Sequence, residues 1–449
     1  MVSSVQYGED GTTDQPTAFP WVVCAVLASF NALSYMDRLL LGLLSLPLQR
    51  DLHIDDVQFG LLQGLAFSII YVACSPAAGW ATDRFSRRTM VFAGVLVWSL
   101  ATMSCGHANT FYQLFLSRSL VGVGEAMLAP AAFAILAEQT PPGRLGIAMS
   151  IYAIGAGLGV VGALTGGGAA ISAIPKEGVT IPLFGHLQPW QFAFVLLGAP
   201  GMFLAFLAFV LPGRTARPSA GRSRLSECDE QPSFWRFLVT RRGALFCQQI
   251  GFSMLGLAGY AIVGWAPAFF GRAFGWSPAK AGPLLGVAVG VGGLIGMSVF
   301  GAAADRRFRQ GDDSAYFRTH MITTLCGAPI IVLAFLVHQP WLCMGLLMLG
   351  FPLLYSFGGS ATAALQLITP SALRGRAGGL YLFTINVLGL GIGPLAVGTL
   401  TDKVFASPRM VGASVAVTVA VSSAIAVVCL ALGQGAFRQA MRLTRGPAV

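Results

Sequence analysis

Two acids and two arginines lie inside long apolar stretches of this sequence, where a charged side chain needs a partner. Asp37 and Glu125 are the only ones of the 18 acids that lie deep in such a stretch, and Arg38 and Arg118 accompany them. A charge at the centre of a bilayer costs about 3 kcal/mol on insertion scales, so such groups are expected to face the protein interior. A carboxylate can bind and release a proton as its surroundings change, whereas arginine stays charged.

The spacing of these residues predicts a cluster. Arg118 and Glu125 are seven residues apart, which places them on one helix face about 10 Å apart along the axis. Asp37 falls at a depth between them if its helix runs in the opposite direction. If the two helices face each other, Asp37 and Glu125 can bind and release a proton beside Arg118 as fixed counter-charge; the alternative is a static ion pair. Two roles are left open for Arg38: contact with an anionic head group, together with Tyr35, or a local ion pair with an acid.

The composition indicates which elements must hold these residues. Of 449 residues, 55% are hydrophobic and 10% are charged, and the mean hydropathy is +0.71. Soluble proteins carry about 25% charged residues. The composition excludes a soluble globular enzyme, a disordered chain and a secreted disulfide scaffold. It predicts an all-α membrane protein in contact with the lipid bilayer. The Lys and Arg residues behind the net charge of +10 occur in short groups between apolar runs and do not form one basic surface. A nucleic-acid partner is therefore not expected.

Twelve apolar runs are long enough to cross a bilayer core of about 30 Å as helices. They lie near 21–48, 57–82, 89–106, 111–137, 145–171, 190–211, 244–270, 281–303, 319–337, 341–368, 377–401 and 411–435.

The basic residues predict the orientation of these runs. Of the 28 Lys and Arg, 20 fall in the segments on the side of the two chain ends and 6 on the other side. This bias predicts a multi-pass protein of the cell membrane (inner or plasma) with both termini in the cytoplasm. The first 20 residues hold no Lys or Arg, so the first run is expected to be a retained span and not a signal peptide.

The two halves of the sequence repeat each other. Gly143, Arg144 and Gly146 pair with Gly375, Arg376 and Gly378 at one offset, and three further glycines follow at the same offset. A basic, Pro- and Ser-rich linker separates the halves. The expected organisation is a tail (1–20), a six-helix bundle (21–212), a linker (213–243), a second six-helix bundle (244–436) and a tail (437–449).

Three stretches resemble a known superfamily and one of its families. Residues 79–88, which read Gly-Trp-Ala-Thr-Asp-Arg-Phe-Ser-Arg-Arg, are similar to the loop motif of the major facilitator superfamily, with Ser86 in place of its second glycine. Residues 35–38 and 118–126 resemble signatures of the Spinster family, lysolipid and sphingolipid transporters of that superfamily. The resemblance implies two pseudo-symmetric six-helix bundles, alternating access and proton-coupled movement of a lysophospholipid or sphingoid-type amphiphile. The Gly-Pro pair of antiporters is absent from the run 145–171.

The resemblance also implies a gate on the cytoplasmic side, because its acids face helix starts in the opposite half, where the helix dipole favours them. The expected contacts are Asp83 with Arg376, Asp305 with Arg144, and Glu138 with Arg84 or Arg88. The alternative is that these are solvated loop charges.

The second half offers mostly hydroxyl-bearing and apolar residues, which suits an amphiphilic substrate. Its polar candidates are Ser253, Tyr260, Tyr355, Ser356, Ser360, Gln366, Tyr381, Thr384 and Asn386, most of them expected to join helices. No ionisable residue of this half is expected to lie as deep in a span as Asp37 and Glu125.

Other functions receive little support. The alternative within the same class is a proton-coupled carrier of organic acids or drugs; a lipid scramblase or receptor gives the buried acids no role. No HExxH or GxSxG occurs, which disfavours an enzyme, and the GxGxxG at 157–162 follows no strand. The five histidines lie in loops or at run ends, so no metal and no cofactor is expected, and residues 50–56 are interpreted as a solvated face. A monomer is expected.

Overall fold

Twelve helices of the described chain are long and apolar enough to cross a membrane. The computed structural model describes residues 20–141, 144–182, 185–213, 233–370 and 373–445. The helices begin and end within a few residues of the twelve predicted runs, except that the last, Pro408–Thr444, continues well beyond residue 435. Apolar run length alone therefore located the spans correctly.

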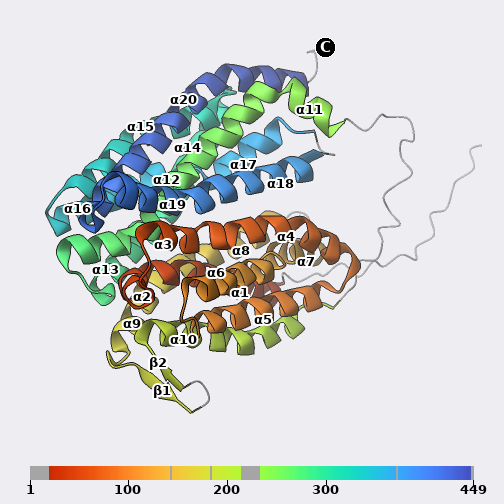
Figure 1. The fold of residues 1–449 in the computed structure, drawn as a ribbon. Coiled ribbons are helices and arrows are strands. Elements are labelled where there is room, and N and C mark those ends of the chain that lie inside the picture. Colours follow the sequence, from red (N-terminus) through yellow and green to blue (C-terminus); the bar gives the residue numbers. More distant parts are fainter. Residues whose placement is uncertain (1–19, 142–143, 183–184, 214–232, 371–372, 446–449) are drawn as a thin grey trace, which may run out of the picture.

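The helices form two bundles, one from each half of the chain (Figure 1). The first bundle consists of α1 (Trp21–Leu43), α2 (Ser45–Leu52), α3 (Asp56–Gln63), α4 (Leu65–Arg84), α5 (Arg87–Cys105), α6 (Phe111–Glu125), α7 (Leu128–Gln139), α8 (Leu145–Gly162), η2 (Ala163–Gly167), α9 (Gly168–Ala173), α10 (Pro189–Ala205) and η3 (Phe206–Val210).

The second bundle repeats this arrangement. It consists of α12 (Arg242–Phe274), α13 (Pro278–Leu285), η4 (Gly286–Val291), α14 (Gly292–Arg309), α15 (Ala315–Leu336), α16 (Pro340–Leu354), α17 (Gly358–Leu367), α18 (Arg374–Thr384), η6 (Ile385–Ile392), α19 (Gly393–Thr399), η7 (Leu400–Val404), η8 (Pro408–Met410) and α20 (Val411–Arg445).

Three short elements lie outside the predicted pattern. Strands β1 (Val179–Ile181) and β2 (Gly185–Leu187) form an antiparallel hairpin with Val179 opposite Leu187, and α11 (Phe234–Thr240) lies in the predicted linker. The segment 437–449, expected as a tail, is helical as far as Arg445. We call the side of the molecule with the hairpin the hairpin side, and the side with α11 and the last turns of α20 the linker side (Figure 1).

Several spans are built from two shorter helices, and glycine explains one of these breaks. Gly64 separates α3 from α4, and a Cβ at this position would collide with the backbone oxygens of Gly391 and Leu390 in the opposite bundle. Only glycine allows the two backbones to approach so closely.

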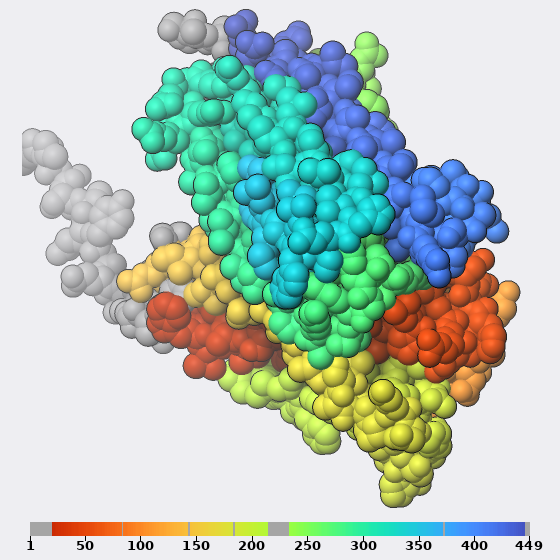
Figure 2. Space-filling view, turned by 90° about the vertical axis from the view of Figure 1, so that its left-hand side faces the viewer, coloured from red at the N-terminus to blue at the C-terminus, as the bar shows by residue number. Residues whose placement is uncertain are grey.

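The two bundles share a continuous apolar core on the hairpin side. One buried cluster joins Leu44, Phe59 and Leu62 of the first bundle to Trp265 and Phe270 of the second. Figure 2 looks onto this side, where green segments of the second bundle lie against red and yellow segments of the first. The bundles are therefore in contact through their hairpin-side halves.

Candidate functional site

The four charged residues predicted to cluster do lie together, between α1 and α6. Asp37 and Arg38 are neighbours on α1, and Arg118 and Glu125 both belong to α6. Asp37, Arg118 and Glu125 are buried, with 1%, 1% and 2% of their surfaces exposed. The cluster contains two acids and two arginines, so its charges balance.

Arg38 and Glu125 form the tighter of two ion pairs. Arg38 donates from Nε to Oε2 of Glu125 at 2.7 Å, and its Nη2 lies 2.5 Å from the same oxygen. Ser34 also donates from Oγ to this oxygen, at 2.6 Å. The other carboxylate oxygen, Oε1, has no hydrogen-bond partner among the described residues. Glu125 is therefore held by one oxygen, and the second can accept a proton without breaking a hydrogen bond.

Three aromatic rings surround the Arg38 guanidinium. Its Cζ lies 5.1 Å from the ring centroid of Tyr35, 4.6 Å from that of Phe67 and 5.3 Å from that of Tyr71. Cation–π attraction of this kind contributes about 0.5–2 kcal/mol per ring, more when water is excluded. The rings therefore fix the position of the cation independently of Glu125, so that Arg38 stays in place if the carboxylate releases it.

Asp37 and Arg118 form the looser pair. The closest approach, from Nη1 of Arg118 to Oδ2 of Asp37, is 3.5 Å, and neither carboxylate oxygen of Asp37 has a hydrogen-bond partner in the described protein. The same nitrogen also lies 3.5 Å from the backbone oxygen of Asp37. Thr102 and Cys105 of α5 lie beside this pair, which is enclosed within the first bundle.

The pairing differs from the predicted one, in which Arg118 served both acids. Ser34 and Arg38 are four residues apart on α1, so both side chains project from one helix face toward Glu125. Asp37, one residue earlier, projects from a different face toward Arg118. Spacing along a single helix predicted that these residues cluster, but the direction in which neighbouring residues point decided the partners. Arg38 thus has the local acid partner that was one of its two expected roles.

Tyrosines of the second bundle lie close to this cluster. Tyr260 lies near Tyr35, Arg38 and Tyr355, and Tyr355 lies near Tyr35 and Tyr381. The hydroxyl of Tyr381 is buried with no hydrogen-bond partner among the described residues. Tyr260 therefore brings its ring and hydroxyl group close to Arg38 from the opposite half of the chain, and Tyr355 brings them close to Tyr35.

Other polar candidates of the second bundle bond within or between its own helices. Thr384 donates to the backbone oxygen of Leu380, and Asn386 donates to that of Leu382. Ser356 contacts His320, as described next. They join or stabilise helices, as most of this group was expected to do.

His320 corrects the prediction that the histidines lie in loops or at span ends and that the second half holds no deep ionisable residue. It is fully buried in α15, where Nδ1 lies 3.0 Å from Oγ of Ser356, and its ring packs against Phe252 with a centroid distance of 5.8 Å. The prediction failed because α15 begins at Ala315, four residues before the predicted run, which places His320 within the span.

The residues predicted to form the linker-side gate are not joined across the bundles where the structure describes them. Asp305 accepts a hydrogen bond from Oη of Tyr316 at 2.7 Å, within its own bundle. Arg144 and Arg376 are both exposed, and neither makes an ion pair with a described side chain. The side chain of Asp83 lies outside the described residues.

The predicted partner of Glu138 is wrong. Glu138 forms an ion pair with Arg87, and the Arg87 side chain also donates to the backbone oxygen of Ala134. Arg84 instead lies over the ring of Trp80, at 4.4 Å, and Arg88 lies over Phe209. Of the three arginines in this loop, Arg87 faces α7, which carries Glu138.

The hairpin side holds a cross-bundle ion pair that sequence reasoning missed. Asp56 was placed in a solvated face, but it is 3% exposed, and its two oxygens bind Arg272 at 2.5 Å and 2.7 Å. Gln49 contacts both residues, and the carboxylate of Asp402 accepts a hydrogen bond from the backbone N–H of Val57 at 2.8 Å. The local sequence gave no signal for this pair, because its partners are 216 residues apart and each lies at a span end.

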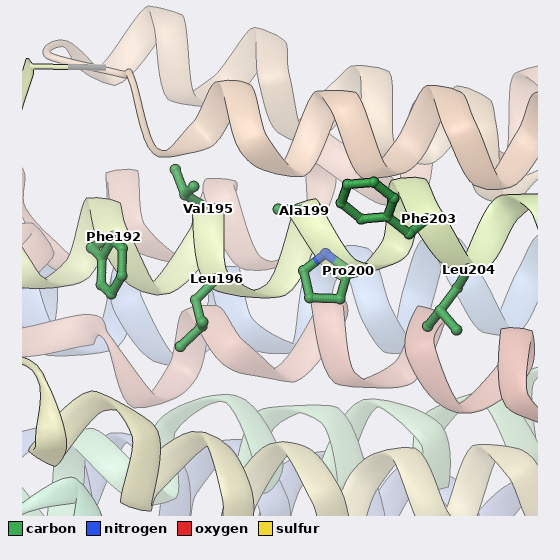
Figure 3. A pocket seen from close by; sticks show the side chains of 7 residues that line it. All are labelled: Phe192, Val195, Leu196, Ala199, Pro200, Phe203 and Leu204. Carbon is green, nitrogen blue, oxygen red and sulfur yellow. The ribbon is translucent and has the colours of Figure 1, made fainter. Parts of the chain in front are cut away.

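An apolar groove runs along the outside of α10, away from the charged cluster. Figure 3 shows its lining side chains on that one helix, among them Phe192, Leu196, Pro200 and Phe203. Its lining holds no charged residue. Within the described ranges, no group of three or more His, Cys, Asp or Glu residues is arranged to hold a metal ion.

Two six-span bundles, with a buried charge cluster in the first and tyrosines of the second beside it, fit the repeat architecture of secondary transporters. The chain belongs to the Major Facilitator Superfamily, whose family model matches residues 26–394.

Similar proteins include transporters of several kinds. An MFS-type efflux pump of Mycolicibacterium smegmatis is 29% identical over 93% of this chain and 94% of that protein. Sphingosine-1-phosphate transporter SPNS2 of Danio rerio is 24% identical over 86% of this chain and 76% of that protein. The crystal structure of a bacterial homolog to the human lysosomal transporter Spinster, inward-facing and unoccupied, matches with a TM-score of 0.77 at 21% identity, covering 96% of this chain and 100% of that one. The resemblance to the Spinster family is confirmed.

Proposed function

We propose that this protein is a proton-coupled transporter that moves an amphiphile with an anionic head group by alternating access. The observation that carries the proposal is the Arg38–Glu125 pair, held at 2.5 Å inside an aromatic cage. A buried arginine without a counter-charge has a high free energy, because its charge is neither hydrated nor paired. When Glu125 takes up a proton, Arg38 therefore needs another anion, and the head group of the substrate supplies it.

This exchange couples the two ligands. Protonation of Glu125 and binding of an anion at Arg38 favour each other, because each compensates the charge that the other leaves unpaired. The transporter then carries the proton and the anionic substrate at the same time, and both cross the membrane in the same direction. Asp37, with two oxygens free of hydrogen bonds and Arg118 at 3.5 Å, is the second proton position in this proposal.

The surroundings of Arg38 favour an amphiphile. Tyr35, Phe67 and Tyr71 present apolar ring faces beside the cation, and Tyr260 and Tyr355 add hydroxyl groups from the other bundle. A single-chain phospholipid matches a site of this kind, with its phosphate at the guanidinium and its chain along the rings. The name of the relative from Danio rerio, a sphingosine-1-phosphate transporter, supports the same class of substrate.

The same carrier mechanism serves a second class of substrate, organic acids or drugs. A relative from Escherichia coli named as a probable galactarate/D-glucarate transporter, 24% identical over 88% of this chain, favours the organic acids. A small organic anion would use Arg38 in the same way, but it would not need the apolar walls.

The predicted topology completes the proposal. The excess of Arg and Lys on the linker side supports a cytoplasmic position for that side and for both chain ends. Asp83 with Arg376, and Asp305 with Arg144, are proposed to meet when the linker side closes. The protein is proposed to act as a monomer, which native mass spectrometry of the purified protein would test.

Leaflet exchange in liposomes tests the function. The protein is reconstituted with a fluorescent single-chain phospholipid, a pH gradient is imposed, the membrane potential is clamped at zero, and albumin extracts the lipid from the outer leaflet. We expect a pH-dependent leaflet ratio for the unaltered protein and for the loop control Glu177→Gln, and none for Arg38→Ala. Equal leaflet distributions in every sample, with an organic acid accumulated instead, would favour the second candidate.

A further inference from the structure

The span Pro340–Leu367 is broken in its middle, next to the transport site. Its two helices, α16 and α17, are separated by Tyr355, Ser356 and Phe357. The span Phe111–Gln139 of the first bundle is also broken, between α6 and α7, directly after Glu125. Tyr355 lies near Tyr35 of the first bundle. Each bundle therefore brings a broken span to the site, one carrying Glu125 and the other carrying Tyr355.

The hydroxyl of Ser356 lies among three polar groups at this break. Its Oγ donates to the backbone oxygen of Leu353 at 3.0 Å. The same Oγ lies 3.0 Å from Nδ1 of His320 and 3.2 Å from Oγ1 of Thr323. Leu353 is in the last turn of α16, where carbonyl groups lack a partner within the helix. Because a carbonyl can only accept, it uses the single hydrogen of the serine hydroxyl. His320 must then be the donor, with its proton on Nδ1 and a lone pair on Nε2.

The ring of His320 is enclosed by apolar groups. It is fully buried, and it packs against the fully buried ring of Phe252 on α12, which also contacts Phe357 at the break. Nε2 of His320 has no hydrogen-bond partner among the described residues. A buried polar ring with an unpartnered nitrogen costs more free energy than an apolar side chain of similar size. Packing alone therefore does not account for a histidine here, whereas the hydrogen bond to Ser356 does.

The ring of Tyr355 fits into a narrow slot beside the break. It stacks on Phe351 with a centroid distance of 5.2 Å and meets Phe357 edge-on at 5.4 Å. Gly259 of α12 makes room for it, because a Cβ at that position would collide with the tyrosine ring. The direction in which Tyr355 points thus depends on the backbone at residues 355–357.

We propose that His320 is a positioning residue of the transport site. Its Nδ1–H fixes the hydroxyl of Ser356, the hydroxyl fixes the end of α16, and the fixed backbone presents the adjacent Tyr355 to the substrate. The inference rests on the place that the proposed function gives to Tyr355. His320 does not touch the substrate, so it sets the affinity for the substrate and not the coupling to protons.

Fluorine NMR of one tyrosine tests the positioning without substrate or a proton gradient. Fluorotyrosine is incorporated at position 355 alone, in the full chain in lipid nanodiscs. We expect a changed spectrum for His320→Leu, which has no donor, and for Ser356→Ala. His320→Asn keeps the spectrum of the unaltered protein, because its amide nitrogen is bonded to Cγ as Nδ1 is. The matched control Thr418→Val removes a buried hydroxyl that bonds within α20 and leaves the spectrum unchanged.

Transport kinetics connect the position of Tyr355 to substrate binding. With a single-chain phospholipid in liposomes, His320→Leu is expected to raise the apparent KM about tenfold at a similar maximum rate, as expected for one hydrogen bond to a charged group. Tyr355→Phe raises KM by a similar factor, and the two changes combined give no further rise, because both remove the same contact. The leaflet ratio held by a pH gradient stays that of the unaltered protein in His320→Leu.

Three results would overturn the positioning role. The first is an unchanged spectrum in folded His320→Leu and Ser356→Ala proteins. The second is a His320→Asn protein that behaves as His320→Leu does. The third is a pair of KM factors that multiply in the double variant, which places the effect of His320 away from Tyr355. Absence of lipid transport in every sample counts against the proposed function alone, because the spectrum is recorded with neither substrate nor gradient.

Discussion

Replacement of Glu125 by glutamine tests the coupling proposal, because glutamine has nearly the same shape but cannot exchange a proton. Oε2 of Glu125 accepts the bonds from Ser34 and Arg38, and a glutamine carbonyl oxygen can accept the same bonds. Glutamine keeps these hydrogen bonds but leaves Arg38 without its counter-charge, as protonated Glu125 does, so the fold is expected to survive with a lower stability. The change removes the one step in which the counter-charge of Arg38 is neutralised by a proton.

The magnitude follows from the gradient. One pH unit is worth about 1.4 kcal/mol per proton, which is a factor of ten in a concentration ratio. With one coupled proton and no membrane potential, the unaltered protein is expected to hold a leaflet ratio of about ten for a single-chain phospholipid at a gradient of one unit. Glu125→Gln is expected to bring the ratio to about one. Exchange of labelled for unlabelled lipid without a gradient should persist, because it needs no net proton movement.

The assay is albumin extraction from liposomes, with a pH-sensitive dye inside to follow protons. Glu177→Gln, an exposed loop acid, is the matched control and keeps the ratio of the unaltered protein. If Glu125→Gln holds a tenfold ratio, the proton is carried elsewhere and the role given to Glu125 is wrong.

Three further predictions concern Asp37, the buried pair and the contact between the bundles. If Asp37 carries a second coupled proton, the unaltered protein holds a leaflet ratio of about one hundred at a gradient of one pH unit instead of ten, and Asp37→Asn lowers it about tenfold. An unchanged ratio with a lower melting temperature would mean that Asp37 and Arg118 are a static pair. Glu125→Ala leaves Arg38 buried without an anion and should destabilise the protein by about 3–5 kcal/mol. The double variant Glu125→Ala with Arg38→Ala should be destabilised less, because it leaves no unpaired charge. Thermal unfolding in detergent compares the two variants, and equal melting temperatures would contradict the buried pair. Gly60→Ala places a methyl group 2.8 Å from the backbone oxygen of Pro394 in the opposite bundle. It should lengthen the distance between spin labels at the exposed positions Arg50 and Arg409, whereas Gly379→Ala, in open space, should not. Identical distances in both variants would contradict close packing at Gly60.

The sequence predicted the spans well because a membrane imposes a length and a polarity on each of them. Twelve runs of sufficient apolar length became twelve helices, and errors appeared only at the ends, where α20 continues past the predicted span and α15 begins before it. Because α15 begins earlier than predicted, His320 lies in the buried interior of the bundle and not at the end of the span.

The site was predicted in its members but not in its contacts. Asp37, Arg38, Arg118 and Glu125 stood out because charges are rare in apolar runs, and the structure brings all four together. Their partners depend on the rotation of each helix about its axis, which spacing along one helix does not give. The same reason explains why Glu138 was assigned to Arg84 or Arg88 and not to Arg87.

The pair of Asp56 and Arg272 was not predictable from local sequence. Asp56 was interpreted as part of a solvated face, and Arg272 was only counted among the basic residues outside the spans. Only the packing of α3 against the second bundle buries them together.

The central claim is that the anionic substrate reaches Arg38 when Glu125 accepts a proton, and infrared difference spectroscopy tests it directly. Single-chain phospholipid is added to the purified protein at constant pH, and the carbonyl band of a protonated carboxylic acid is followed. We expect the band to appear in the unaltered protein and in Asp37→Asn, and to be absent in Glu125→Gln. Bound lipid with no such band, or an equal band in Glu125→Gln, would contradict the claim.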